Sequence, residues 1–467
     1  MKRLTPLILL ALSILPFEGH CKPADIIVKK PIKTASGNRP EKIVLPEIKP
    51  VPFKAPQIKE FVTPKGIKAW LVEDSSSPLI AVSILFKGGA AADPERLTGL
   101  SELAVSLLDE GAGNLRAGEF QEKAAAKAIK MSFSADSDTI SASMTAPAKY
   151  AADAFGLLRL ALTKPRFDND AVRRVKEQMY AVIDSRKGRP EARVRERWNK
   201  LVFSGHPYSR VLPAKEGVKA VGRPNLKRFV KTRFAKDNMI VSVTGNMTQQ
   251  ALIPLLDGAF GGLPEKAAVR NVAPFVPELK DGVDILTMDV PQSATIFGHR
   301  GIARNDPDFY PALLVMHILG SGGFSSRLFN AVREEKGLTY DVGAVLSVRE
   351  ASPAIVGWAS SENAKLAEAI SLIRREWEKM ARDGPAPEEL NDAKTFLTGS
   401  FPLTFASNAD LATFMSGLQL HGLPRDYFER RNDLINAVTL ENAKETAGRI
   451  LRPESLFFVV VGKPANL

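Results

Sequence analysis

Apolar residues recur along this chain with two spacings, which predict where strands and helices lie. Apolar and polar residues alternate through Gln57–Pro64 and through Ile67–Asp74, on either side of a Lys65-Gly66 turn, as in a β-hairpin. Helical spacing follows in four segments, with Thr98 as the N-cap of the first: 98–108, 119–128, 150–162 and 171–186. Strands and helices come in runs instead of strict alternation, so the pattern predicts an α+β fold.

The pattern of the first part of the chain returns in the second part. The segment RFAKDNMIVSVTG ends at Gly245, and the similar segment RILRPESLFFVVVG ends at Gly462, 217 positions later. Amphipathic helices around Val172 and Leu390 keep almost the same offset, 218 positions. Matched offsets of this kind indicate an internal repeat. We therefore expect two homologous α/β-sandwich units that together form a clam-like chain.

Composition and the repeat divide the chain into five expected segments. The region after the N-terminal apolar stretch is rich in Lys, Pro, Val and Ile, which is typical of an extended arm and not of a packed domain. The expected segments are a signal peptide (1–21), this arm (22–55), an N-terminal unit (56–263), a proline-containing linker (264–281) and a C-terminal unit (282–467).

The N-terminus has the layout of a secretory signal. Lys2 and Arg3 precede an apolar run from Leu4 to Phe17, which is too short for a membrane span of about 20 residues. Cys21, the only cysteine, lies near the expected cleavage point, and a lipid anchor on it is the alternative to simple cleavage. No later stretch is apolar enough for a transmembrane segment. We therefore expect an exported protein of a bacterial periplasm.

The charge of the chain bears on its partners. Lysine and arginine outnumber the acidic residues and give a net charge of +12, yet they are scattered along the sequence. A nucleic-acid-binding protein gathers its positive charge in a patch, often with interleaved aromatic residues. We therefore expect no nucleic-acid partner, and the charge instead favours acidic peptides or an acidic partner protein.

Four segments carry motifs of defined spacing. They are LFKGGAAADPERLTGLSELAVSLLDEGAG (85–113), HPYSR (206–210), DVPQSATIFGHRGIARNDPDFY (289–310) and SGGFSSRLFNAVREEKGLTYDVGA (321–344). Together they resemble the pitrilysin/insulinase/mitochondrial-processing-type zinc metallopeptidase family over essentially the whole chain after the arm. The resemblance implies two halves of the LuxS/processing-peptidase-like metallopeptidase fold.

Catalytic members of that family carry a His-x-x-Glu-His motif on the helix after a glycine-bearing loop. Histidines four residues apart share one helix face and bind one zinc, and the glutamate activates the metal-bound water. Alignment on the preceding turn places these positions at Glu102, Val105 and Ser106, and none matches. The family's third ligand is a glutamate seven residues after another glutamate, a spacing that here joins Glu177 to Asp184. We therefore expect a degenerate metal site and no metal in this chain.

Other chemistries are weighed against this interpretation. Glu102, Ser106 and Asp184 could hold a hard cation such as Ca²⁺ or Mg²⁺ and make a stand-alone hydrolase; the alternative is a solvated Glu102 and a packed Ser106. A serine or cysteine hydrolase has no support, because the chain lacks a G-x-S-x-G motif and any cysteine after residue 21. The later histidines lack the i, i+4 spacing of a zinc site: 206, 299, 317 and 421.

The motif of the second half is intact. Family peptidases hold the substrate carbonyl with an arginine and a tyrosine seven residues apart, and Arg333 and Tyr340 have that spacing. Guanidinium and phenol donors suit a carbonyl that becomes an oxyanion; the alternative is a solvated Arg333 and a core Tyr340. Ser321, Gly322 and Gly323 resemble the family's glycine-rich loop, where backbone approaches an extended peptide, or they form a simple helix-ending turn.

In two-chain members of the family, one subunit supplies the zinc helix and the other supplies substrate-holding residues. The resemblance implies that this chain is the non-catalytic, substrate-binding subunit of an exported heterodimeric zinc endopeptidase. It would have no cofactor of its own, a homologous zinc-bearing partner and peptide substrates. The alternative is a structural or peptide-binding family member with no peptidase role. Contacts between the two halves are expected to be modest, as in a lid that opens a chamber.

Overall fold

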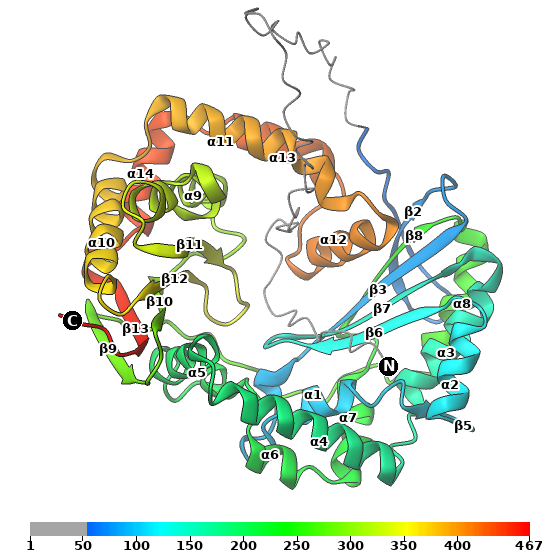
Figure 1. The fold of residues 1–467 in the computed structure, drawn as a ribbon. Coiled ribbons are helices and arrows are strands. Elements are labelled where there is room, and N and C mark those ends of the chain that lie inside the picture. The colour runs from blue at the N-terminus through cyan, green and yellow to red at the C-terminus, as the bar shows by residue number, and fades with distance from the viewer. Residues whose placement is uncertain (1–53) are drawn as a thin grey trace, which may run out of the picture.

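The computed structural model describes residues 54–467, so the expected signal peptide, Cys21 and the arm up to residue 53 lie outside the described residues. Two β-sheets organise the fold (Figure 1). The first has the strand order β1-β2-β8-β3-β7-β6. Its strands are β1 (Lys59–Val62), β2 (Lys68–Glu73), β3 (Leu79–Lys87), β6 (Lys130–Ala135), β7 (Thr139–Pro147) and β8 (Met239–Gly245).

The second sheet repeats the topology of the first. Its order is β11-β12-β10-β13-β9, and β9 pairs in parallel with β13 as β2 does with β8. β8 and β13 end at Gly245 and Gly462, the two glycines that align the repeat. The predicted pair of homologous α+β halves is confirmed. The strands are β9 (Gly282–Thr287), β10 (Gln292–Arg300), β11 (Thr339–Ser347), β12 (Ala354–Glu362) and β13 (Phe457–Gly462).

Helices cover the sheets in both halves, and the four predicted helical segments correspond to the first four of them. Within residues 54–467 no helix has the length and apolar character of a bilayer span. The first half contains α1 (Leu100–Val105), α2 (Ala117–Ala125), α3 (Ala151–Thr163), α4 (Asn169–Arg186), α5 (Pro190–Val202), α6 (Lys215–Ala220), α7 (Arg223–Arg233) and α8 (Gln249–Phe260). The second half contains α9 (Phe309–Met316), α10 (Leu366–Asp383), α11 (Pro387–Gly399), α12 (Asn408–Leu420), α13 (Tyr427–Asn436) and α14 (Leu440–Ile450).

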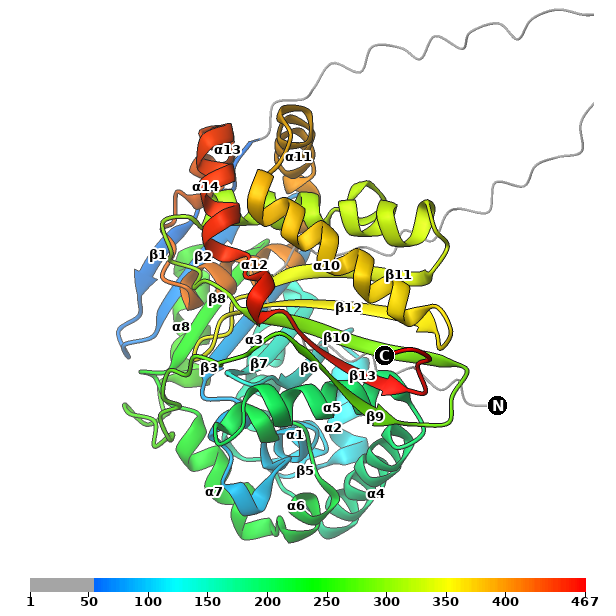
Figure 2. The ribbon, with the colours of Figure 1, turned by 90° about the vertical axis from the view of Figure 1, so that its left-hand side faces the viewer.

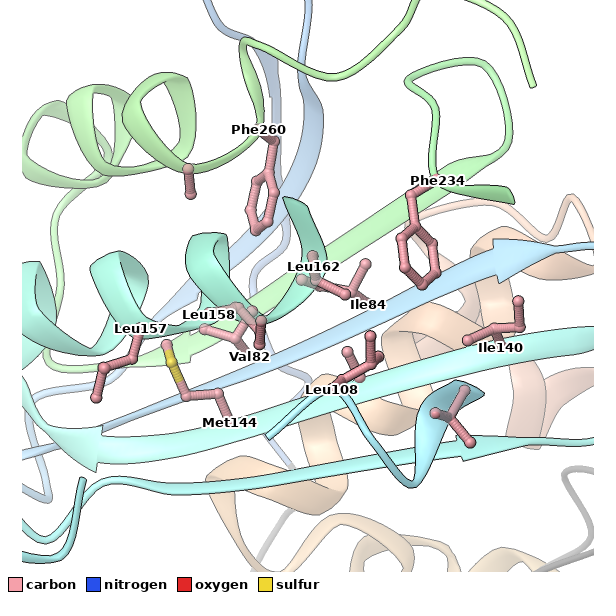
Figure 3. Close-up of a cluster of buried hydrophobic side chains, with 14 of the residues drawn as sticks. Val82, Ile84, Leu108, Ile140, Met144, Leu157, Leu158, Leu162, Phe234 and Phe260 are labelled. Atoms are coloured by element: carbon pink, nitrogen blue, oxygen red, sulfur yellow. The ribbon is translucent and has the colours of Figure 1, made fainter. Parts of the chain in front are cut away.

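The residues of β3 alternate between two different faces of the first sheet. Val82, Ile84 and Phe86 are buried on one face, where Figure 3 shows side chains of α3 and α8 above the sheet. Full burial of each such side chain stabilises the fold by about 1.5–3 kcal/mol. Ala81 and Ser83 lie on the opposite face and are also buried, although no helix of the first half covers that face.

Each half covers the second face of the other half's sheet with one helix. α12 of the second half packs across β3 and β8, and α5 of the first half packs on β10 and β13 (Figures 1 and 2). The Ser416 hydroxyl donates to the Ser83 carbonyl at 3.2 Å, and the Gln419 amide donates to the Val241 carbonyl at 3.2 Å. The small and polar residues on this face of β3 and β8 therefore find their partners in the other half.

Two hydrophobic cores consequently contain residues of both halves. One joins Trp198 of α5 to Val459 of β13, and another joins Trp70 of β2 to Met415 of α12. The expectation of modest contacts between the halves is wrong for this reason. Neither sheet has two covered faces without the other half, so the chain forms one body.

The two halves also meet through a polar junction. The Tyr208 hydroxyl donates to the Asp138 carboxylate at 2.5 Å in the β6–β7 turn, and it accepts from the Ala351 N–H at 3.0 Å in the β11–β12 turn. The backbone N–H of Phe275, between the two sheets in sequence, donates to the Ala351 carbonyl at 2.8 Å. Burial raises the pKa of the Asp138 carboxyl group. The boundaries of the five expected segments stay predictions.

Candidate functional site

The helix that carries the degenerate motif begins directly after a left-handed glycine. Gly99 has φ +90°, and a Cβ atom there would lie 2.9 Å from the Pro213 side chain, so glycine is required. In α1, Val105 is 2% exposed and packs into the core of the first half. The Ser106 hydroxyl donates to the Glu102 carbonyl oxygen at 2.8 Å. That hydroxyl is therefore engaged with its own helix.

A buried ion pair fixes the loop before α1. Asp93 and Arg233 lie 3.1 Å apart, and their side chains are 2% and 6% exposed. Asp93 also accepts from the Ser101 hydroxyl and backbone N–H at 2.6 and 2.9 Å, and Arg233 donates to the Gly89 carbonyl at 3.0 Å. Removing one partner of such a pair typically destabilises a protein by about 3–5 kcal/mol. These contacts hold α1 in place without a metal ion.

The two carboxylates predicted for the metal site have different partners. Burial raises the pKa of Glu102, and the charge of Arg186 on α4 partly offsets this effect. Asp184, two residues before Arg186, forms ion pairs with Lys187 and Lys215 at 2.9 Å each, and these lower its pKa. Positions two apart on a helix point to nearly opposite sides. The structure therefore does not bring Asp184 together with Glu102, and it turns Arg186 toward Glu102 instead.

The donors around α1 do not fit a catalytic zinc. The two histidine positions hold Glu102, whose pKa burial raises, and Ser106, whose hydroxyl is bonded within α1. Asp184 is held by two lysines. Val105, at the position of the water-activating glutamate, cannot accept a proton. Zinc sites need three or four nitrogen, sulfur or oxygen ligands in tetrahedral geometry. Across residues 54–467, no three His, Cys, Asp or Glu side chains are grouped so as to hold a metal ion. For the same reason, Glu102, Ser106 and Asp184 do not form the coordination site for Ca²⁺ or Mg²⁺ that was the alternative interpretation.

Three of the histidines in residues 54–467 pack against aromatic rings: 206, 299 and 317. His206 stacks on the Phe275 ring with centroids 5.0 Å apart. His299 accepts a hydrogen bond from the Trp377 indole at 3.1 Å. Burial lowers the pKa of His299 and of His421 to about 4, so both rings are neutral near pH 7.

The structure brings the retained arginine and tyrosine side by side. Arg333 lies in a π-helical turn, Phe329–Glu334, and Tyr340 is the second residue of β11. The guanidinium carbon of Arg333 is 4.7 Å from the centre of the Phe329 ring and 5.2 Å from the centre of the Tyr340 ring. The Tyr340 side chain is 79% exposed, which contradicts the alternative of a core aromatic. Within the described residues, neither side chain forms a hydrogen bond or an ion pair, so their donors are free for a ligand.

The predicted glycine-rich loop lies beside this pair. Ser321 ends a π-helical turn, His317–Ser321, and the Gly322 N–H donates to the His317 carbonyl at 2.8 Å. Gly323 then adopts φ +59°, with open space where a Cβ atom would be. The loop is thus a helix-ending turn whose exposed glycine leaves room for an approaching backbone. A role in substrate binding stays a prediction.

Phe324 joins the loop to the arginine, and sequence reasoning missed it. Its ring packs edge-on against Phe329 at 4.8 Å and lies 5.9 Å from the Arg333 guanidinium carbon, while 75% of its side chain stays exposed. A large aromatic residue directly after two glycines was the available signal. Phe324 and Tyr340 together give the free guanidinium an apolar rim.

The family follows from residues in both halves. Residues 68–214 match the family of insulinases (peptidase family M16), and residues 220–397 match the peptidase M16 inactive domain. The chain belongs to the M16 family. Within that family, the α1 donor set described above makes it a non-catalytic member.

Named relatives of this M16 protein extend over most of its length. It is 22% identical over 391 residues to a Helicobacter pylori protein named non-peptidase homolog YmxG. The aligned region covers 83% of this chain and 90% of that relative. It is also 22% identical over 412 residues to a Bacillus subtilis protein named uncharacterized zinc protease YmxG. Here the aligned region covers 88% of this chain and 99% of the relative. The relatives thus include one whose name says that it lacks peptidase activity.

Solved structures show the same fold. A peptidase M16 inactive domain from Pseudomonas fluorescens superposes with a TM-score of 0.81 at 24% identity, covering 87% of this chain and 98% of that one. The periplasmic protease PqqL from Escherichia coli gives a TM-score of 0.76 at 15% identity, covering 94% of this chain and 49% of that one. At these identities the likeness establishes the fold alone.

Proposed function

We propose that this M16 protein is the substrate-binding subunit of an exported heterodimeric zinc endopeptidase, working beside a homologous subunit that supplies the zinc. One combination of observations carries the proposal. The positions of the zinc motif lack its two histidines and its glutamate, whereas Arg333 and Tyr340 lie together and their polar atoms have no partner within residues 54–467. The half-buried Arg333 and the exposed Tyr340 thus offer donors to a ligand in a chain whose own α1 cannot cut it by the family mechanism.

The geometry suggests how the pair acts on a peptide. Packing against Phe329 and Tyr340 leaves the N–H groups of Arg333 at the edge of the guanidinium plane free to donate. The Tyr340 hydroxyl supplies one further donor. Both fit the carbonyl oxygen of the bond to be cut, and both bind it more strongly as it gains negative charge. Phe324 gives the neighbouring peptide side chain an apolar contact.

The shared cores support an assembly of two rigid subunits. Because α5 and α12 tie the two halves of this chain together, the space that admits a peptide would open between subunits and not within this chain. The N-terminal sequence supports export, and so does the periplasmic location named for the structurally similar protease PqqL.

A reconstitution experiment tests the proposal. The chain is purified from its native cell envelope to identify a co-eluting family member with an intact His-x-x-Glu-His motif. The two subunits are then expressed separately and mixed with a quenched fluorescent peptide. We expect activity that neither subunit shows alone. A partner that is fully active without this chain would contradict the shared site.

The second candidate function is a structural or peptide-binding role without any peptidase. The name of the Helicobacter pylori relative, non-peptidase homolog, favours it. It predicts that the chain binds peptides by itself, that no zinc-bearing family member co-elutes, and that mixing with any such member leaves the member's turnover unchanged.

A further inference from the structure

A hollow on the second half is separate from the Arg333 site. Its cavity volume is about 260 Å³. It lies where the segment between the two sheets, around Phe275–Pro277, meets the loop after β10 and the residues that follow α14. Nothing in the proposed peptidase chemistry uses this hollow.

One side of the hollow is apolar. Phe275, Val276, Ile302 and Pro353 contribute to it. Val276 is 60% exposed, which is unusual for a valine whose neighbours Phe275 and Pro277 pack against the protein. An apolar ligand group would remove this surface from water.

The other side carries two unpaired cations. Arg300 and Arg452 both line the hollow, and within residues 54–467 neither guanidinium forms an ion pair or donates a hydrogen bond. Arg449 also lines it but is held by Asp306 at 2.7 Å and Asp308 at 2.8 Å. Asp306 is the only acidic residue in the lining, and this ion pair neutralises it. The hollow therefore presents an uncompensated positive charge.

A single histidine joins the backbone at Arg300 to the backbone at Arg452. His299 lies beneath them, with its Nε2 accepting from the Trp377 indole at 3.1 Å and from the Arg452 backbone N–H at 3.3 Å. Its Nδ1 must then carry the proton, which it donates to the Arg300 carbonyl at 2.8 Å. One buried imidazole thus holds the backbone of both arginines. These hydrogen bonds fix the backbone from which each of the two arginine side chains extends.

The two sides of the hollow indicate which chemical groups a ligand would need. Guanidinium groups without an acidic partner suit a carboxylate, and the apolar side suits an aliphatic or aromatic group of the same ligand. The last residue of a peptide places both groups on one Cα atom. An internal Asp or Glu would bring the carboxylate but would leave the apolar side empty.

We propose that this hollow binds the C-terminal residue of a peptide, through its carboxylate at Arg300 and Arg452 and its apolar side chain at Val276. The proposal goes beyond the heterodimer and does not depend on the partner. It gives the chain a way to retain peptide ends, whether they belong to substrates, to products or to an attached protein.

The test measures binding to the isolated chain by fluorescence anisotropy. The probe is a labelled peptide with a C-terminal leucine, made with a free carboxylate and as the C-terminal amide. We expect the free acid to bind about tenfold more tightly than the amide, a difference of about 1.4 kcal/mol, because hydrogen bonds to a charged carboxylate are stronger than those to a neutral amide. Arg300→Gln or Arg452→Gln should abolish that difference and leave the amide unaffected. Val276→Asp, at an exposed position, should weaken both peptides by removing the apolar contact, and should weaken the acid further by charge repulsion.

Matched variants separate this site from the rest of the surface. Arg430→Gln removes a charge from an exposed i, i+4 pair on α13 and should leave the preference for the acid intact. Equal binding of acid and amide, or a preference that survives both Arg300→Gln and Arg452→Gln, would overturn the proposal. Loss of the preference in Arg333→Ala would also overturn it, because the carboxylate would then be bound at the other site.

Discussion

The centre of the Tyr340 ring lies 5.2 Å from the guanidinium carbon of Arg333, across the turn that contains Gly337. Gly337 has φ +59°, a conformation that favours glycine, and it reverses the chain between the π-helical turn and β11. The seven-residue spacing of the pair is thus the length of this reversal. It places a stacked arginine and an exposed phenol on the same surface.

The first prediction concerns the phenol. In the assembled peptidase, Tyr340→Phe should lower kcat about 10²–10³-fold, because it deletes one donor to the developing oxyanion. Zinc content and assembly should be unchanged. Arg333→Ala should lower turnover further and raise KM, because it removes donors and also the group against which Tyr340 packs. Steady-state kinetics on a fluorogenic peptide measure both effects.

Glu335→Ala is the control for these two variants. Glu335 is exposed and lies two residues after Arg333 in the same charged run, so its removal changes local charge without touching the pair. Its kinetics should match those of the unmodified complex. If Tyr340→Phe also has normal kinetics, the pair is structural and the proposed function loses its main support.

The second prediction concerns zinc. Elemental analysis of the isolated chain should find no stoichiometric zinc, and Glu102→His, Val105→Glu or Ser106→His alone should not change this result. Each histidine variant adds one ligand and leaves the site incomplete, and Val105→Glu restores the water-activating residue without adding a ligand. The three changes together restore the motif on α1 but supply no ligand from α4. About one tightly held zinc per unmodified chain would contradict the assignment.

The structure also indicates which α4 position completes a restored site. Val182 lies one helical turn before Arg186, the residue whose charge acts on Glu102, whereas Asp184 is held by Lys187 and Lys215. Added to the triple variant, Val182→Glu should therefore bind zinc more tightly than Asp184→Glu does. Competition with a chromogenic chelator gives the two dissociation constants, and the opposite order would show that α4 presents its Asp184 side to α1.

The third prediction follows from the exchange of helices. Met415 of α12 is fully buried against the first half, so Met415→Ala should destabilise the protein by about 2–5 kcal/mol. Both halves should still unfold in one transition in guanidinium, followed by circular dichroism and by tryptophan fluorescence. Thr413→Ala, exposed on the same helix, should change the free energy of unfolding by less than about 0.5 kcal/mol. Two separate transitions would show that the halves are independent.

The fourth prediction concerns pH. Burial lowers the pKa of His299 to about 4, whereas an unfolded histidine titrates near 6.5. Between these values the unfolded chain binds a proton that the folded chain does not. The stabilising contribution is therefore complete above about pH 6.5 and is lost as the pH falls toward 4, by about 3 kcal/mol.

Urea unfolding at pH 7.5 and at pH 5 measures this effect. His299→Gln should be less stable at pH 7.5 and should show a shallower loss of stability at pH 5 than the unmodified chain. Burial also lowers the pKa of His421 to about 4, so His421 too makes the protein less stable at low pH. Because His421 is present in both the variant and the unmodified chain, a pH dependence remains in the variant. An identical pH slope in the variant would exclude His299 as a source.

The amino-acid sequence by itself determined the features that depend on local spacing. Alternation around Lys65-Gly66 gave the β1–β2 hairpin, in which Lys59 pairs with Leu71. The offset between Gly245 and Gly462 gave the repeat of two sheets with one topology. The loss of the catalytic motif also needs no tertiary structure, because Val105 cannot activate a water in any fold and neither Glu102 nor Ser106 offers the imidazole nitrogen of the motif.

Only the tertiary structure decided which distant residues meet. The sequence spacing that selected Asp184 does not say which side of α4 faces α1. In the folded chain Asp184 lies instead beside Lys187 and Lys215, with which it forms ion pairs. Ser83 is buried under Ser416, and His299 binds the backbone of Arg452. Each of these contacts joins segments more than a hundred residues apart. Helical and strand periodicity encodes which residues share a face, within a few positions of one another. It does not encode which two faces come together, because that depends on how whole helices and sheets bury their surfaces against each other.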